Sequence, residues 1–156
     1  SIPSNVSELK KGWCAGTAKL NCIKIMPNNP FFKNYNDQLI VGKADANNEV
    51  YDTLVFVSRD IETITIPLNI KIIAPYAFSM SNIESIFIPS NVTEIKKHAF
   101  SFCGQLQSVK IQHDSNLKII GKKAFAETSI EKFFVPSKVT QICEGAFLRL
   151  NYISNF

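Results

Sequence analysis

The two histidines are the first residues to test for catalytic chemistry, because histidine is the side chain that most readily transfers protons near neutral pH. His98 precedes an Ala-Phe pair, and His113 stands beside Asp114 in an HDSN sequence. Neither has a nucleophile at a readable spacing, and the chain has no Gly-x-Ser-x-Gly, His-Glu-x-x-His or phosphate-loop motif. We interpret His98 as an exposed filler position and His113 as part of a turn. The sequence therefore predicts no catalytic residue and a protein that is not an enzyme.

One oxygen-rich segment is a candidate for a metal site. Asp45, Asn47, Glu49 and Asp52 alternate as ligands do at the start of a calcium loop. Such a loop needs glycine where this chain has valine, and a bidentate glutamate where it has phenylalanine. The polar tip of a β-hairpin explains the same residues, so we expect no metal site and no cofactor, with calcium as the alternative.

The four cysteines are the remaining residues that could do chemistry. They are Cys14, Cys22, Cys103 and Cys143, and no pair has a Cys-x-x-Cys or zinc-site spacing. We interpret them as free thiols that pack as small hydrophobic side chains. A bridge between Cys14 and Cys22 stays open as the alternative.

A repeated unit carries most of these residues. The stretch from Ile88 to Ile111, IPSNVTEIKKHAFSFCGQLQSVKI, begins with an Ile-Pro-Ser-Asn turn and places Ala-Phe at its centre. It ends in an apolar-x-x-apolar-x-apolar run, which is typical of a short strand with one buried face. The spacing of 23 residues, with one short strand per copy, is the leucine-rich-repeat pattern. The copies span residues 2–25, 66–88, 88–111, 111–135 and 135–156.

An irregular insertion, residues 26–65, interrupts the repeats. Its PNNPFFKNYND sequence predicts turns and irregular chain, because proline and asparagine are enriched there. The runs QLIVG (38–42) and TLVFV (53–57) predict two strands of a hairpin, and the strand pattern resumes at Ile61. We expect an elaborated coil within one domain that covers residues 1–156, rather than a separate domain with its own core.

The repeats predict how the chain packs. No single coil can enclose its own apolar side chains, so each buries them against the coils on either side. We therefore expect an α/β fold: a right-handed solenoid with a parallel sheet on its concave face and short helices or turns on its convex face. The phenylalanines of the Ala-Phe pairs should stack as one convex-side ladder, formed by Phe78, Phe100, Phe125 and Phe147.

Composition agrees with one soluble domain. The chain has 156 residues, of which 46% are hydrophobic, and a formal net charge of +4. This charge is well short of that of a dedicated nucleic-acid binder, so we expect no nucleic-acid partner. No apolar run approaches the roughly 18 residues that cross a bilayer, and Ser1 does not begin a signal peptide. The compartment is left undetermined by these features.

The concave sheet offers the best candidate for a binding surface. Residues between the buried positions of each strand should point outward, and seven of them form our predicted partner site: Lys24, Thr65, Phe87, Ser108, Lys110, Lys132 and Phe134. Two exposed aromatic residues that flank a lysine are typical anchors of protein interfaces. A neutral sheet surface is the alternative.

Lysine pairs recur just before the central pair of three coils. Stacking would align them in a basic stripe, formed by Lys10, Lys11, Lys96, Lys97, Lys122 and Lys123. A solvated convex surface explains the stripe, and attraction to an anionic glycan or a membrane surface is the functional alternative.

The end of the last copy has an apolar side with no coil beyond it. Val139, Ile142, Phe147 and Ile153 have a neighbouring coil on one side only, so we expect self-association through the C-terminal coil, or fraying there.

The repeat resembles the BspA-like, or treponemal-type, class of leucine-rich repeats. The shared features are Ile-Pro, Ala-Phe and the Cys-x-x-Leu element from Cys103 to Leu106, and the NPFF…NDQLIVGK…LVFV block resembles a coil of trichomonad members. The resemblance implies a cell-surface or extracellular protein that adheres to host cells, host proteins or the extracellular matrix. An intracellular scaffold for a cytosolic partner is the competing interpretation.

Overall fold

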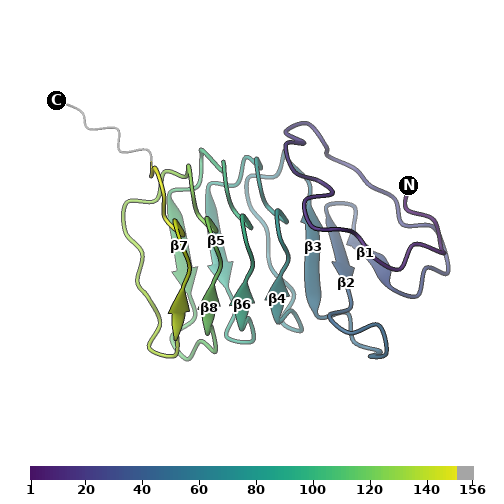
Figure 1. Cartoon of the computed structure of the whole chain (residues 1–156). Coiled ribbons are helices and arrows are strands. Elements are labelled where there is room, and N and C mark those ends of the chain that lie inside the picture. The colour runs from purple at the N-terminus through teal and green to yellow at the C-terminus, as the bar shows by residue number, and fades with distance from the viewer. Residues whose placement is uncertain (151–156) are drawn as a thin grey trace.

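The computed structural model describes residues 1–150 as a stack of coils built from short strands and turns. Nine strands are present in these residues (Figure 1): β1 (Phe32–Asn36), β2 (Leu39–Gly42), β3 (Thr53–Val57), β4 (Ile72–Ile73), β5 (Ser85–Ile88), β6 (Glu94–Ile95), β7 (Ser108–Ile111), β8 (Ile119–Ile120) and β9 (Gln141–Ile142). No α-helix occurs among residues 1–150. The solenoid prediction is therefore confirmed and the α/β class is wrong. Of the two alternatives for the convex face, the structure has turns and not short helices.

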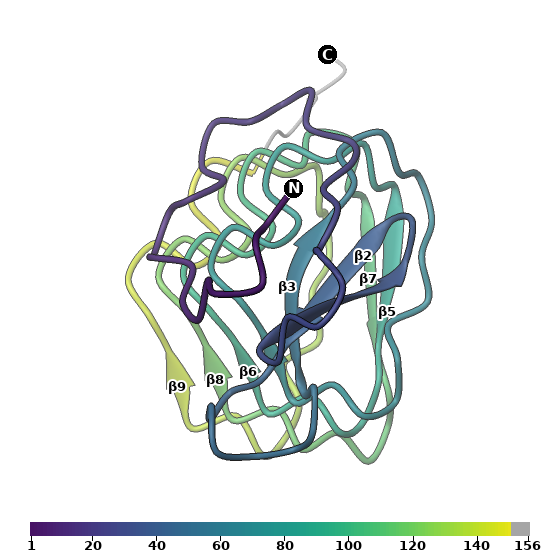
Figure 2. The same ribbon diagram turned by 90° about the vertical axis from the view of Figure 1, so that its right-hand side faces the viewer.

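Within residues 1–150, two sheets run along the stack instead of one. The longer sheet has the order β1-β2-β3-β4-β6-β8-β9, in which β3, β4, β6, β8 and β9 pair in parallel. The shorter sheet pairs β5 with β7, with Phe87 opposite Lys110. Figure 2 shows β6, β8 and β9 along one side of the coils and β5 and β7 along the other. The strand-like ends of the repeats predict only the shorter sheet. The regular coils join the longer sheet through two-residue strands that each end in isoleucine: Ile73, Ile95, Ile120 and Ile142.

Residues with positive φ explain why the convex side has turns and no helix. In each coil one such residue precedes the Ala-Phe pair, or Trp13-Cys14 in the first coil, and another follows two positions after it. The first column is Gly12, Tyr76, His98, Lys123 and Gly145, and the second is Gly16, Met80, Phe102, Glu127 and Arg149. A left-handed residue ends an α-helix, so the three residues between the columns are too few for a helical turn.

The coil interior is a ladder of phenylalanine rings, as predicted. Phe78 stacks on Phe100 with ring centroids 4.5 Å apart, Phe100 on Phe125 at 5.0 Å, and Phe125 on Phe147 at 5.5 Å. The first three rings are fully buried and Phe147 is partly buried. The backbone of this side is also linked between coils, since the Phe78 amide donates to the Ala99 carbonyl and the Phe100 amide to the Ala124 carbonyl, both at 2.8 Å.

The insertion forms a three-stranded antiparallel meander that extends the longer sheet. The β2–β3 hairpin is confirmed, but β1 lies in the segment that we expected to be irregular. The buried Asn29 starts β1: its Oδ1 accepts the amides of Phe31 and Phe32, and its Nδ2 donates to the carbonyls of Pro3 and Val6. Figure 2 shows the first coil in front of β1–β3 at this end of the stack.

A second apolar cluster joins the insertion to the first coil. It contains Cys14, Phe32, Ile40, Val55 and Phe56, with Trp13 packed on Phe56 at a centroid distance of 5.9 Å. The first coil keeps the repeat register, because Ile2 forms a parallel bridge with Ile25. The insertion therefore shares apolar packing with the first coil as well as with the solenoid.

Candidate protein-binding groove

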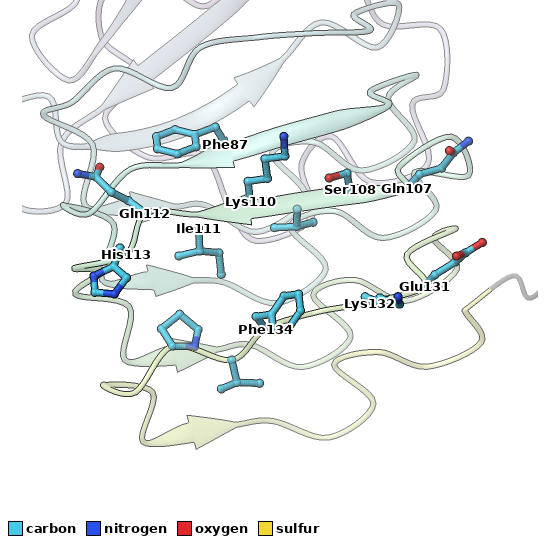
Figure 3. Close-up of a pocket in the computed structure, with 13 residues that line it drawn as sticks. Phe87, Gln107, Ser108, Lys110, Ile111, Gln112, His113, Glu131, Lys132 and Phe134 are labelled. Carbon is cyan, nitrogen blue, oxygen red and sulfur yellow. The ribbon is translucent and has the colours of Figure 1, made fainter.

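A groove of about 990 Å³ lies beside β7, between that strand and the segment 131–136 (Figure 3). Its lining includes β7 over its whole length, Phe87 from β5, and Phe134 from the opposite bank. Figure 3 shows Phe87 and Lys110 side by side on neighbouring strands, with Phe134 across the groove from them. The groove therefore brings together Phe87, Lys110 and Phe134, which the sequence predicts at equivalent outward positions of successive repeats.

The groove exists because residues 130–135, where the 111–135 copy predicts its closing strand, do not pair with β7. The Ser129 amide donates to the Leu106 carbonyl at 3.0 Å, as the Gln107 amide does to Glu84 in the previous coil. Beyond Ser129, no backbone hydrogen bond within residues 1–150 joins the segment 130–136 to β7. The strand predicted for 130–135 is therefore wrong, and β7 has one paired edge and one open edge.

Phe133 supplies a physical reason for the separation. Its ring packs against Phe125 at 5.2 Å and Phe147 at 4.7 Å, in a place where neighbouring coils carry the smaller Ile86 and Val109. An added aromatic ring in a packed interior displaces backbone. Val135, which the repeat places inside, is 50% exposed. The size of the Phe133 side chain is therefore a reason for the groove. The repeat pattern gave no sign of it, because phenylalanine fits an apolar repeat position as isoleucine or valine does.

Exposure distinguishes the groove from an ordinary sheet surface. Phe134 is 82% exposed and Phe87 is 50% exposed, although aromatic rings are usually buried when a neighbour is available. Ser108 and Lys132 also line the groove, and Thr65 lies next to it through its bridge to Phe87. Lys24 does not join this surface: it belongs to the first coil, where its carbonyl accepts the Ile2 amide.

Four polar residues that line the groove were not predicted from the alternation of buried and outward positions. They are Gln107, Gln112, His113 and Glu131. They flank the strand positions rather than occupying them, so the period-2 pattern gives no signal for them. The Oε1 atom of Gln112 accepts the Ser90 amide at 3.0 Å, which fixes this side chain between coils.

The open edge of β7 gives the groove a specific chemical capacity. An unpaired strand edge presents alternating N–H and C=O groups, which an extended peptide can satisfy by adding a strand. Alternate side chains of such a peptide would meet the exposed rings of Phe87 and Phe134. Lys110 and Lys132 outnumber Glu131 in the lining, so the groove favours a peptide with acidic side chains.

His98 is not the exposed filler that we expected. It is half-buried, its ring stacks on Tyr76 with centroids 5.0 Å apart, and its φ of 57° falls in the left-handed region. Burial lowers the pKa of His98, and the charges of Lys97, Lys123, Lys122 and Lys11 lower it further. A neutral, stacked imidazole in a turn column is a packing residue. His113 is exposed at the end of the groove.

Carboxylates in the oxygen-rich segment of the insertion accept hydrogen bonds from nearby backbone amides. Asp52 is buried and accepts the Ala44 amide at 3.0 Å, while Asp45 accepts the Asn47 amide at 2.9 Å. In residues 1–150 no three histidine, cysteine, aspartate or glutamate side chains are grouped to hold a metal ion. These hydrogen bonds are those of a hairpin tip.

The cysteines are free thiols in this structure, but Cys22 is exposed, so the prediction that it packs as a small hydrophobic side chain is wrong. Cys143 is partly buried, and Cys14 and Cys103 are buried. Burial raises the pKa of Cys103 to about 11, and its Sγ donates to the Phe78 carbonyl at 3.0 Å. Burial also raises the pKa of Cys14. Both thiols therefore stay protonated near neutral pH and act as small core side chains.

The lysines of the basic stripe are partly neutralised. Lys10 pairs with Glu8 at 2.8 Å, Lys96 with Glu94 at 2.6 Å, and Lys122 with Glu144. Lys11, Lys97, Lys122 and Lys123 all act on His98, so these four lie around one point of the convex side. Since three of its six lysines are paired with glutamates, the stripe is not a uniformly positive edge.

The last described coil exposes part of the apolar side that the repeat predicts. Ile142 is 48% exposed, whereas Val139 and Phe147 are partly buried, and Ile153 lies outside the described residues. Leu148, which was not predicted, is 43% exposed, and within residues 1–150 β9 pairs only with β8. We expect the apparent mass in light scattering to rise with concentration. Ile142→Lys with Leu148→Lys should suppress that rise, because two charges on the contact oppose association. If the mass stays at that of the monomer and hydrogen exchange over 136–150 is slow, neither self-association nor fraying occurs.

The stacked coils, parallel pairing and phenylalanine ladder define a leucine-rich-repeat solenoid. The chain belongs to the family described as "BspA type Leucine rich repeat region", whose model matches residues 49–154 in six copies. The matched region begins inside the insertion and leaves the first coil outside it. None of the described residues forms a helix long and apolar enough to span a membrane.

Two solved structures with TM-scores above 0.5 show the same fold. A leucine-rich cell surface protein from Faecalibacterium prausnitzii is 21% identical with a TM-score of 0.67, over 81% of this chain and 33% of that one. A leucine-rich repeat protein from Bacteroides capillosus is 22% identical with a TM-score of 0.52, over 78% of this chain and 89% of that one. The pneumococcal vaccine antigen PcpA is 29% identical with a TM-score of 0.48, over 51% of this chain and 20% of that one. This chain thus spans a third or less of two of these proteins. Among curated proteins, none matches it significantly.

Proposed function

We propose that this domain is a non-enzymatic recognition module of a cell-surface protein, and that it binds an extended segment of a host or extracellular-matrix protein in the groove beside β7. The observation that carries the proposal is the open edge of β7, flanked by the exposed rings of Phe87 and Phe134. Leucine-rich repeats of this family are protein-interaction modules. The description of the F. prausnitzii relative as a cell surface protein supports the location.

The binding mode follows from what the groove leaves unsatisfied. Backbone groups on β7 provide affinity for any extended chain, whereas the rings at either bank select side chains by size and shape. Lys110 lies between the rings and steers acidic partners toward the groove. Lys110 and the other lysine of the groove, Lys132, are both exposed, so this electrostatic steering should weaken as the salt concentration is raised.

Replacing Phe87 and Phe134 together with serine should reduce capture of protein partners from host-cell and extracellular-matrix extracts at least about thirtyfold, since a single hot-spot aromatic contributes about 2 kcal/mol or more. The thermal midpoint should change little, because both rings are exposed. Quantitative mass spectrometry of material retained on the immobilised domain measures the loss.

A matched control comes from two apolar residues outside the groove. Phe102 is 51% exposed and Leu68 is 69% exposed, and neither lines the groove. Phe102→Ser with Leu68→Ser should leave capture unchanged. Equal capture by the groove variant and this control would place the partner site elsewhere on the domain.

A further inference from the structure

A second cavity, of about 510 Å³, lies where the first coil meets the insertion and the first regular coil. We call it the junction pocket; it is lined by residues 7–13, Phe31, Phe32, Lys43, Ala44, Ala46, Thr53 and Val55 of β3, Ala74, Pro75 and Lys96. It shares no residue with the groove beside β7. Its volume lies within the range of about 300–1,000 Å³ that is usual for small-molecule sites.

One part of the junction pocket is an apolar wall. Trp13 and Phe31 are half-buried, while Phe32 and Val55 are buried beneath them. The wall is tightly packed, because a Cβ atom at Gly42 would come within 2.9 Å of the Phe32 ring and 3.0 Å of the Val55 side chain. Trp13 is held in turn by its contact with Phe56. The wall is therefore formed before any ligand arrives, which limits the entropy that binding would cost.

The rest of the lining is strongly basic. It contains four lysines, Lys10, Lys11, Lys43 and Lys96, against one acidic residue, Glu8. Lys10 is paired with Glu8, and Lys96 with Glu94 outside the pocket. Across residues 1–150, no carboxylate lies within ion-pair distance of Lys11 or Lys43. Lys43 does contact the Tyr51 ring, with its Nζ 5.2 Å from the centroid.

Neighbouring charges add to this positive field. Gly12 connects the pocket to the lysine cluster, since a Cβ atom at Gly12 would lie 3.8 Å from Tyr76, which stacks on His98. The charges of Lys97, Lys123, Lys122 and Lys11 lower the pKa of that histidine, although Lys122 is paired with Glu144. Lys97 and Lys123 therefore add to the positive potential near Lys11, so an anion near the pocket is attracted by more lysines than those that line it.

We propose that the junction pocket binds a small amphipathic anion of the medium-chain carboxylate class. Its apolar body packs against Trp13 and Phe31, and its carboxylate is neutralised by Lys11 and Lys43. A neutral apolar ligand would leave both ammonium groups without a counter-charge. A small inorganic anion would leave the aromatic wall exposed to water. Only a ligand with both parts satisfies the whole lining.

Trp13 makes the proposal directly testable, because it is the only tryptophan of the chain. Its emission should shift as the pocket fills. Decanoate is titrated below its critical micelle concentration, in parallel with decanol and decyltrimethylammonium, which share the chain length and differ in charge. Decanoate should bind at least about tenfold more tightly than decanol, which corresponds to one unscreened charge contact of about 1.4 kcal/mol, and the cationic probe should bind most weakly.

Two double variants separate the pocket from the rest of the surface. Lys11→Gln with Lys43→Gln should weaken decanoate binding about tenfold and leave decanol binding unchanged. Lys71→Gln with Lys118→Gln makes the same change of charge at two exposed lysines outside the pocket and should affect neither probe. Added sodium chloride should weaken decanoate binding to the unaltered protein but not decanol binding, which gives a readout that requires no mutation.

Several outcomes would overturn the proposal. Equal affinity for decanoate and decanol, or equal salt dependence, would show that the lysines do not select the ligand. Unchanged Trp13 emission with all three probes would show that the pocket does not fill. Preferential binding of a heparin disaccharide, with Lys11 and Lys43 required, would assign the site to an anionic glycan instead. All of these readouts are independent of the groove beside β7.

Discussion

Replacing Phe100 with alanine should lower the free energy of unfolding by about 3–5 kcal/mol, the range for truncation of a fully buried phenylalanine. Phe100 is 0% exposed and lies between two rings, at 4.5 Å from Phe78 and 5.0 Å from Phe125. The substitution would leave a cavity between the rings of Phe78 and Phe125. One coil cannot move to fill it, because each coil is packed against its neighbours on both sides. Denaturant titration measures the loss, read from the midpoint at constant slope.

Phe102 is the matched control for Phe100. It stands two residues away in the same turn, but it is 51% exposed. Phe102→Ala should cost less than about 1 kcal/mol, as changes at exposed positions usually do. Similar losses at the two positions would mean that the ladder is not the main source of stability in this coil.

Gly121→Ala should destabilise the domain by about 3 kcal/mol, at the upper end of the range for overpacking. A Cβ atom at this position would lie 2.6 Å from the Lys96 carbonyl carbon and 2.7 Å from the Lys97 nitrogen. Both are backbone atoms of the preceding coil, so no side-chain rotation can relieve the contact. The two coils would have to separate, which would lengthen the 2.8 Å hydrogen bond from the Gly121 amide to the Ile95 carbonyl.

Gly104→Ala is the corresponding control. A Cβ atom there would meet nothing within 4 Å, and its φ is not in the left-handed region. This change should be neutral or slightly stabilising, because alanine reduces the freedom of the unfolded chain. If Gly121→Ala proves as harmless as Gly104→Ala in thermal and denaturant unfolding, the coils are not in close contact at Gly121.

The repeat register could be predicted from sequence because it depends on local pattern alone. Apolar residues recur at fixed positions, so Phe78, Phe100 and Phe125 had to meet once the coils stacked. The outward column of Phe87, Lys110 and Phe134 follows from the same alternation. The pattern left short helices and turns open as alternatives for the convex side, and the structure has turns. A signal that favours turns was present: Gly12 and Gly145 stand at the repeat position where Tyr76, His98 and Lys123 adopt positive φ.

Tertiary contacts decided the features that the pattern does not encode. Asn29 forms β1 in a segment rich in turn-forming residues, because its amide ties Pro3 and Val6 to the start of the strand. The junction pocket requires residues from the first coil, the insertion and a regular coil to meet, which no local pattern predicts.

At the groove, the sequence predicts the orientation of the side chains but not the pairing of the strand. The alternation around Phe133 and Phe134 correctly predicted which ring turns outward, and it equally predicted a paired strand that does not form. Sequence by itself determined the repeat, the side-chain columns and the family resemblance, since each depends on residue type and spacing. Only the tertiary structure decided that β7 keeps an open edge, because that depends on whether the ring of Phe133 fits between Phe125 and Phe147 without moving the backbone.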